Sequence, residues 1–231
     1  MNKQQVDRRK FIGTLSASAA AMGLSMFTSP VEVAAKQTSS FTDPGDPDAW
    51  FRQIKGRHRI VFDATKPLPM PVMPFAWPRV FLMTNAATGT PEKECSVVMV
   101  IRHEVIAYAL NNEIWQKYKL GEMFKINNPA NQSLALRNPF WQPAPGTYKV
   151  PGVGEVKIGI NELQDSGVLF CACDVALTVY SAVVAAQMNA DPAAMKKEWE
   201  AGILPGIQIV PSGIWAVGRA QEHGCAYCQA G

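Results

Sequence analysis

The stretch Gly167-Val168-Leu169-Phe170-Cys171-Ala172-Cys173-Asp174 joins an apolar run to two thiols and a carboxylate. The apolar run predicts a strand that ends at Cys171 or Cys173. Asp174 is suited to cap the helix that we expect over about 175–188. A cysteine at such a junction faces the positive end of the helix dipole, which favours the thiolate over the thiol. The stretch therefore indicates a strand-to-helix unit with sulfur chemistry at its turn.

Strands and helices alternate on both sides of this stretch. Further strands are expected at 59–64, 96–101, 207–210 and 225–228, and further helices at 78–87, 111–121, 160–166, 192–199 and 214–223. The run at 96–101 is apolar and rich in β-branched residues, which is typical of a strand buried on both faces of a parallel sheet. This order predicts an α/β fold, with right-handed crossovers and helices on both faces of a parallel sheet.

Two segments interrupt the alternation. Residues 67–74 are rich in proline, which excludes a central strand or a helix interior and predicts a loop or lid. Residues 127–159 are dense in Asn, Pro and Gly, and a structureless insertion of this length often serves as a lid or binding loop. Phe140 and Trp141 are its candidates for contact with a substrate, with burial against the sheet as the alternative.

The N-terminus has the features of an export signal. Arg8 and Arg9 precede Phe11 and a weakly apolar run of Ala, Ser and Gly, as in a twin-arginine signal peptide. A small-residue pattern at 33–35 offers a cleavage site, so we expect a signal peptide at 1–35 and a periplasmic protein. An uncleaved anchor or a basic amphipathic tail is the alternative. The run is, however, shorter and less apolar than the ~20 residues that span a bilayer.

The mature chain is expected to be one nearly neutral domain. Removing residues 1–35 takes away four basic and two acidic residues and lowers the formal net charge from +3 to +1. That charge gives no electrostatic case for nucleic acid or anionic lipid, and no later run is long enough for a membrane span, so neither partner is expected. Residues 36–49 predict a flexible leader and 50–231 a single domain. Because a twin-arginine substrate folds before export, in a reducing compartment, its five cysteines are not needed as disulfides for folding.

Short motifs follow one another in the C-terminal third of the chain: Phe170 to Cys173, Leu204-Pro205-Gly206, Val210-Pro211-Ser212-Gly213, Gln221, Gly224 and Tyr227. In this order they resemble the DsrE/DsrF-like sulfur-relay family, with a match that spans 59–229 with gaps. The resemblance implies a three-layer α/β/α sandwich with a five-stranded parallel sheet, and a homo-oligomer, either a trimer or a hexamer. It also implies a functional cysteine at Cys173. The well-known relay proteins are cytoplasmic, so this chain differs from them by its export signal and by its insertion at 127–159.

Three polar side chains are expected beyond the carboxyl ends of strands, where parallel α/β proteins place their sites. They are His103, Cys173 and Ser212. If the second and third strands are neighbours, His103 lies close enough to orient or deprotonate Cys173, as a base does for a nucleophilic thiol. The alternatives are a buried structural or inert thiol at 173 and a packing histidine at 103.

The neighbours of these residues are given more ordinary roles. Cys171 lies within the strand and is expected in the core. Arg102 and Glu104 are expected to form a solvated pair or a local bridge. A hydrolase built on Ser212 lacks the Gly-x-Ser-x-Gly pattern of a nucleophile elbow and ranks last.

A second group of metal-ligand residues lies at the C-terminus, at His223, Cys225 and Cys228. Covalent haem needs a histidine directly after the second cysteine, where Gln229 stands, so no cofactor is expected. Residues three apart on a strand point to opposite faces, which argues against a disulfide or a redox pair. A structural or copper-type metal site that includes Cys173 is the weaker remaining option, because the last strand is expected at the far edge of the sheet; a site between subunits stays open.

Two functions follow from these observations. The first is an exported thiol protein that accepts or transfers sulfane sulfur or redox equivalents at Cys173 with the help of His103. Its partner would be a sulfur donor or acceptor protein or a small sulfur compound. The alternative is a non-catalytic module in the periplasm that binds a small ligand or a metal, or serves assembly.

Overall fold

The computed structural model describes residues 48–67, 74–129 and 131–231. All of them belong to one compact unit, Phe41–Gly231. The expected signal peptide with Arg8 and Arg9, the leader up to residue 47 and most of the proline-rich loop at 67–74 lie outside the described residues.

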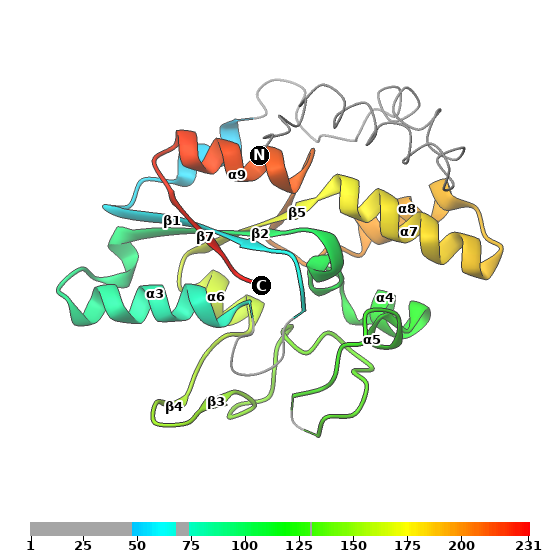
Figure 1. The fold of residues 1–231 in the computed structure, drawn as a ribbon, viewed down its shortest axis with the longest axis horizontal. Coiled ribbons are helices and arrows are strands. Elements are labelled where there is room, and N and C mark those ends of the chain that lie inside the picture. Colours follow the sequence, from blue (N-terminus) through cyan, green and yellow to red (C-terminus); the bar gives the residue numbers. More distant parts are fainter. Residues whose placement is uncertain (1–47, 68–73, 130) are drawn as a thin grey trace, which may run out of the picture. The chain divides into compact units, whose positions relative to one another are not determined.

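A five-stranded parallel sheet forms the centre of this unit (Figure 1). Its strands are β1 (His58–Ala64), β2 (Cys95–Ile101), β5 (Val168–Cys173), β6 (Ile207–Val210) and β7 (Ala226–Gln229). They lie in the order β6-β5-β2-β1-β7, and every neighbouring pair is parallel. The predicted five-stranded parallel sheet is therefore confirmed.

Helices cover both faces of the sheet. The α-helices are α3 (Ala76–Ala87), α4 (Asn112–Tyr118), α5 (Leu120–Met123), α6 (Ile160–Asp165), α7 (Asp174–Met188), α8 (Pro192–Ala201) and α9 (Gly213–Glu222). The 3-10 helices are η3 (Ala49–Gln53), η4 (Glu92–Glu94) and η5 (His103–Ala109). Figure 1 shows α9 on one side of the sheet and α3 and α6 on the other, which gives the predicted three-layer α/β/α architecture. None of the helices in the described ranges is long and apolar enough to cross a membrane.

The two hydrophobic cores follow from the alternation of side chains along each strand. Val61 packs with α9 and η3 on one face, whereas its neighbour Phe62 packs into the larger core on the other face. The central strand β2 is buried on both faces, because Val98 and Val100 belong to the core on the α9 face and Met99 belongs to the larger core on the other face. This accounts for the continuous apolar run that the sequence shows at β2.

The helix expected at 111–121 is interrupted. Asn111 caps its start, with its side-chain oxygen accepting the N–H of Ile114 at 3.0 Å. Lys119 then adopts a left-handed conformation, with φ 49°, and separates α4 from α5. Gly121 allows the insertion to approach, because a Cβ at this position would lie 1.9 Å from the carbonyl oxygen of Ala135.

The insertion at 127–159 is packed onto the body of the domain. It contains a short antiparallel hairpin of β3 (Lys149–Val150) and β4 (Gly154–Glu155), which the sequence did not indicate. Asn138, which is 1% exposed, donates to the carbonyl oxygens of Tyr108 at 2.8 Å and Leu110 at 2.9 Å and accepts the N–H of Phe140 at 3.0 Å. This one side chain ties the insertion to η5.

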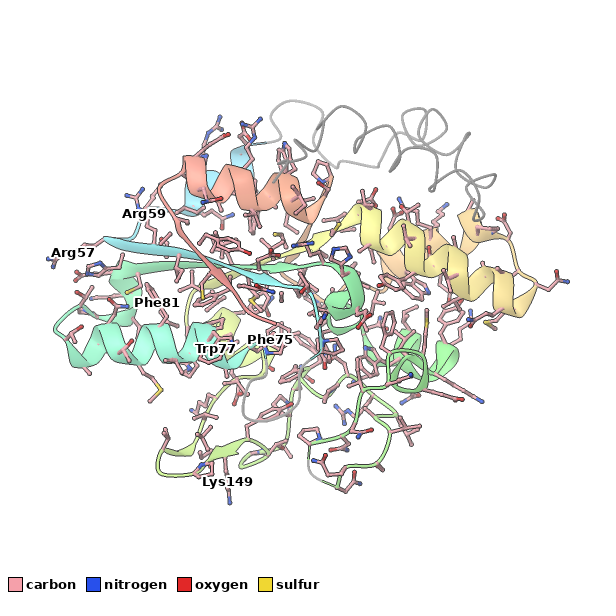
Figure 2. All side chains as sticks on the ribbon, viewed as in Figure 1. Arg57, Arg59, Phe75, Trp77, Phe81 and Lys149 are labelled. Carbon is pink, nitrogen blue, oxygen red and sulfur yellow. The ribbon has the colours of Figure 1, made fainter. Side chains whose placement is uncertain are left out.

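Aromatic rings fill the space beneath the insertion. Phe140 is buried, with ring centroids 4.6 Å from Phe75, 4.9 Å from Tyr108 and 5.2 Å from Tyr148. Figure 2 labels Phe75 on the side of the sheet where the insertion lies. Phe140 is therefore a core residue, which is the alternative to the lid role named above.

Replacing Asn138 by alanine tests this anchor. The change leaves two buried carbonyl groups and one buried N–H without their partner, so we expect it to lower the free energy of unfolding by about 2–4 kcal/mol. Urea denaturation followed by tryptophan fluorescence measures the loss. Asn131→Ala is the control, because Asn131 makes its hydrogen bonds in an exposed local turn and should cost less than about 1 kcal/mol. Equal losses in the two variants would contradict the anchoring role.

Candidate functional site

A cavity of about 300 Å³ opens at the carboxyl edge of the sheet. Its described lining consists of Arg102, His103, Cys173, Val175, Ala176, Val179, Tyr180, Ser212, Gly213 and Ile214. The three polar residues predicted for this edge are thus brought together. They meet because β2, β5 and β6 are neighbours in register, with Ile101 opposite Ala172 and Cys173 opposite Val210.

Cys173 caps the helix that follows it. Its Sγ accepts the backbone N–H of Ala176 at 3.3 Å, and the residue is 6% exposed. The predicted cap, Asp174, is already helical and instead pairs with Lys196 of α8 at 2.8 Å, so that expectation was wrong. The sulfur therefore receives both a hydrogen bond and the positive end of a helix of 15 residues.

Cys171 lies in the core, as expected. It is fully buried on the α9 face, among Val61, Val98 and Val210. Burial raises the pKa of its thiol, which keeps the group protonated and unreactive. The two neighbouring thiols of the strand therefore have separate roles.

His103 is the first residue of η5 and is exposed. Its φ is 52°, a left-handed conformation that is uncommon outside glycine, and it follows Arg102 in an extended conformation. The chain thus turns sharply at the end of β2 and brings His103 to the wall of the cavity. Within the described residues no hydrogen bond joins its ring to Cys173, so its action as a base stays a prediction.

Arg102 and Asp63 form an ion pair that the sequence analysis missed, in which the carboxylate is buried and the arginine side chain is 15% exposed. Nε and Nη2 of Arg102 donate to the two carboxylate oxygens of Asp63 at 2.6 and 2.8 Å, and the hydroxyl of Tyr227 donates to the same carboxylate at 3.2 Å. Asp63 is only 2% exposed. The ion pair raises the pKa of Arg102, and Cys173 adds a smaller electrostatic contribution in the same direction. The expected pairing of Arg102 with Glu104 was wrong.

One signal in the sequence points to this pair. Asp63 is the single charged residue in the otherwise apolar end of β1, and a buried carboxylate needs a cation. Arg102 follows directly after β2, which is the neighbour of β1. The sequence alone does not show that β1 and β2 are neighbours in the sheet.

The start of α9 closes the cavity on its third side. Ser212 caps this helix by accepting the N–H of Trp215 at 3.2 Å. Gly213 lies directly against Arg102, since a Cβ there would come within 2.6 Å of the Cδ of the arginine. Glycine at this position is therefore what lets the arginine side chain lie along the helix start.

The C-terminal ligand candidates do not converge. His223 stacks on Phe51 at 5.9 Å, and Cys225 is buried in the core on the α9 face. Cys228 packs against the core on the opposite face, and two strands separate β7 from the β5 strand of Cys173. The part of the chain that the structure describes holds no group of three or more His, Cys, Asp or Glu placed to bind a metal. All five cysteines lie in this part, as free thiols.

Replacing Asp63 by asparagine tests this ion pair of Asp63 and Arg102. The partly exposed Arg102 would then lose its charged hydrogen-bond partner, so we expect a loss of about 2–3 kcal/mol in the free energy of unfolding. Denaturant titration provides the measurement. Glu222→Gln is the control, because Glu222 pairs with Arg219 at the surface and its loss should change stability by less than about 0.5 kcal/mol. A cost as small for Asp63→Asn would show that the pair does not stabilise the fold.

Cysteine alkylation tests the separation of the thiols. Burial raises the pKa of both Cys171 and Cys225, the latter to about 11, so near neutral pH iodoacetamide should modify Cys173 before either of them. Labelling of Cys225 should increase as the pH rises towards that value, because only the thiolate reacts. Peptide mass spectrometry identifies the order. Labelling of Cys225 as early as Cys173 in the folded protein would contradict it.

Comparisons with known proteins leave the family open. No protein-family model matches the chain, and no curated protein matches it. A similar solved structure is that of a protein of unknown function from Methanobacterium thermoautotrophicum, with 16% sequence identity and a TM-score of 0.34. The match covers 74% of this chain and 98% of that chain.

Proposed function

We propose that this protein accepts and passes on sulfane sulfur at Cys173, in the periplasm after twin-arginine export. The observation that carries the proposal is the position of the Cys173 sulfur. It caps α7 inside a cavity that His103 and Arg102 also line. The resemblance to the sulfur-relay family supports the same chemistry, and a homo-oligomer, a trimer or a hexamer, is part of the proposal.

The reaction is a sulfur exchange that needs no external oxidant. The thiolate of Cys173 attacks the outer sulfur of a persulfide, a new S–S bond forms at Sγ, and the S–S bond of the donor breaks. The donor leaves as a thiolate, and Cys173 carries the transferred sulfur. An acceptor thiolate then attacks that sulfur and releases Cys173 as a thiolate. Each step conserves electrons, because one S–S bond replaces another.

The surroundings of Cys173 suit both states of this cycle. The N–H of Ala176 and the dipole of α7 stabilise negative charge on Sγ or on an attached sulfur. Asp174 adds little opposing charge, because Lys196 neutralises it. His103, at the same cavity, supplies a base for the thiol proton and an acid for the leaving thiolate.

Loading of the protein with sulfur tests the proposal directly. After incubation with a persulfide donor, the peptide that contains Cys173 should gain the mass of one sulfur atom in a form that dithiothreitol removes. Cys173→Ser should take up none at this peptide, whereas Cys228→Ser, which alters a thiol at the far edge of the sheet, should load like the parent. Absence of sulfur on Cys173 with every donor would refute the proposal and leave the cavity as a binding site only.

The role of His103 is tested with His103→Asn. Asparagine tolerates the left-handed conformation at this position, so the backbone is preserved. General-base catalysis contributes about 100-fold or more, so loss of the base should slow loading at neutral pH by at least about tenfold. The difference should vanish at alkaline pH, where thiolate forms unaided. Loading rates measured across pH give the result, and equal rates at every pH would exclude His103 as the base.

A further inference from the structure

We infer that Arg102 makes the cavity selective for small sulfur donors that carry an anionic group close to the sulfane sulfur, such as a carboxylate or a sulfonate. The inference rests on the proposed function and names its substrate class. Arg102 would bind the anionic group while Cys173 attacks the sulfur. The arginine is thus assigned as a specificity-determining residue.

The geometry of the guanidinium group is the first argument. Two of its three nitrogens, Nε and Nη2, are committed to Asp63. Within the described residues no hydrogen bond involves Nη1, so the N–H groups of this nitrogen are available to bind a ligand. Asp63 also holds the group in one orientation, and a preorganised donor binds an anion at a small entropic cost.

The position of Arg102 in the cavity is the second argument. Arg102 and Cys173 line the same space, and the two side chains interact electrostatically. The starts of α7 and α9 lie at the same cavity, so their backbone dipoles add to the positive potential there. The carboxylates of Asp63 and Asp174 are each paired with a cation. Burial and then the exposed Glu104, next to His103, raise the pKa of Tyr180, so Glu104 is the carboxylate that opposes this potential.

The remaining walls set the size and character of the donor. Val175, Val179 and Ile214 give the cavity apolar sides, and each of them is more than half exposed, so the cavity is open to solvent. A volume of about 300 Å³ accepts a small molecule but not a folded protein domain. The combination suits a compact donor with one anionic end and a short apolar body.

Two donors share this chemistry and differ in what leaves. With thiosulfate, Cys173 thiolate attacks the outer sulfur, its S–S bond breaks, and sulfite leaves with the electron pair. With a carboxylate-bearing alkyl persulfide, the same bond changes release a carboxylate-bearing thiolate. Both reactions balance in atoms and charge without another reactant.

Loading kinetics with matched donors test the inference. The donors are 2-carboxyethyl persulfide and 2-hydroxyethyl persulfide, which differ in the charge of their tail, with thiosulfate as a third. Arg102→Lys keeps a cation for Asp63 but removes the free end of the fork. We expect it to slow loading from both anionic-tail donors by at least about tenfold and to change loading from the hydroxyl donor by less than about twofold.

Two further variants serve as controls. Arg219→Lys makes the same change at an arginine that pairs with Glu222 at the surface, outside the cavity lining, and should leave the donor preference unchanged. If Arg102→Lys does not fold, Gly213→Ala provides a second route, because its Cβ displaces the arginine side chain and should lower the same preference. An equal effect of Arg102→Lys on charged and uncharged donors would overturn the inference, as would a parent protein without preference.

A second readout does not depend on sulfur transfer. Iodoacetate and iodoacetamide alkylate a thiol by the same reaction, and only iodoacetate is anionic. The ratio of their rates at Cys173 should fall at least about fivefold in Arg102→Lys if Arg102 binds anions. If no donor loads Cys173 but this ratio falls, the sulfur-transfer proposal fails and the anion site stands. An unchanged ratio removes the anion site.

Discussion

The ion pair between Asp63 and Arg102 is the constraint on which the site depends. Asp63 lies at the end of β1, Arg102 directly after β2, and Tyr227 of β7 joins them through its hydroxyl group. One carboxylate therefore connects three neighbouring strands at their carboxyl edge. The buried carboxylate of Asp63 is tolerated only when its partner is in place, so the pair favours this arrangement of the strands. Gly213, at the start of α9, allows the arginine to occupy that place.

The second constraint is the turn from β5 into α7. Cys173 sits where the last strand residue becomes the helix cap, so its sulfur replaces the oxygen of a usual capping side chain. Two positions earlier, Cys171 faces the core and stays a neutral thiol because burial raises its pKa. A single strand thus supplies one inert thiol and one thiol at the cavity. The two differ because Cys171 lies within the strand, whereas Cys173 lies at its end.

Much of the architecture was predictable because it follows from local patterns. The apolar runs at 96–101 and 207–210 predict their strands almost to the residue, and Asn111 and Asp191, at or directly before the starts of two of the expected helices, cap them. The interruption at Lys119 and the hairpin of the insertion were not predicted. Near Lys119, Gly121 packs against Ala135 of the insertion, which is a contact between separate segments. The two strands of the hairpin have only two residues each, too few for a periodic pattern. The role of Asp174 was predicted wrongly because its partner, Lys196, lies on another helix, and the sequence does not show that the two residues meet.

The sequence by itself determined the strands and most of the helices, the parallel arrangement of the sheet and the edge at which His103, Cys173 and Ser212 would gather. Hydrophobic periodicity and capping residues act over a few positions, so they can be read directly from the chain. Only the tertiary structure decided that Arg102 faces Asp63 and not Glu104, and that the thiol shares its cavity with an arginine. Those contacts depend on strand order and register, because residues far apart in sequence become neighbours only when the strands pair.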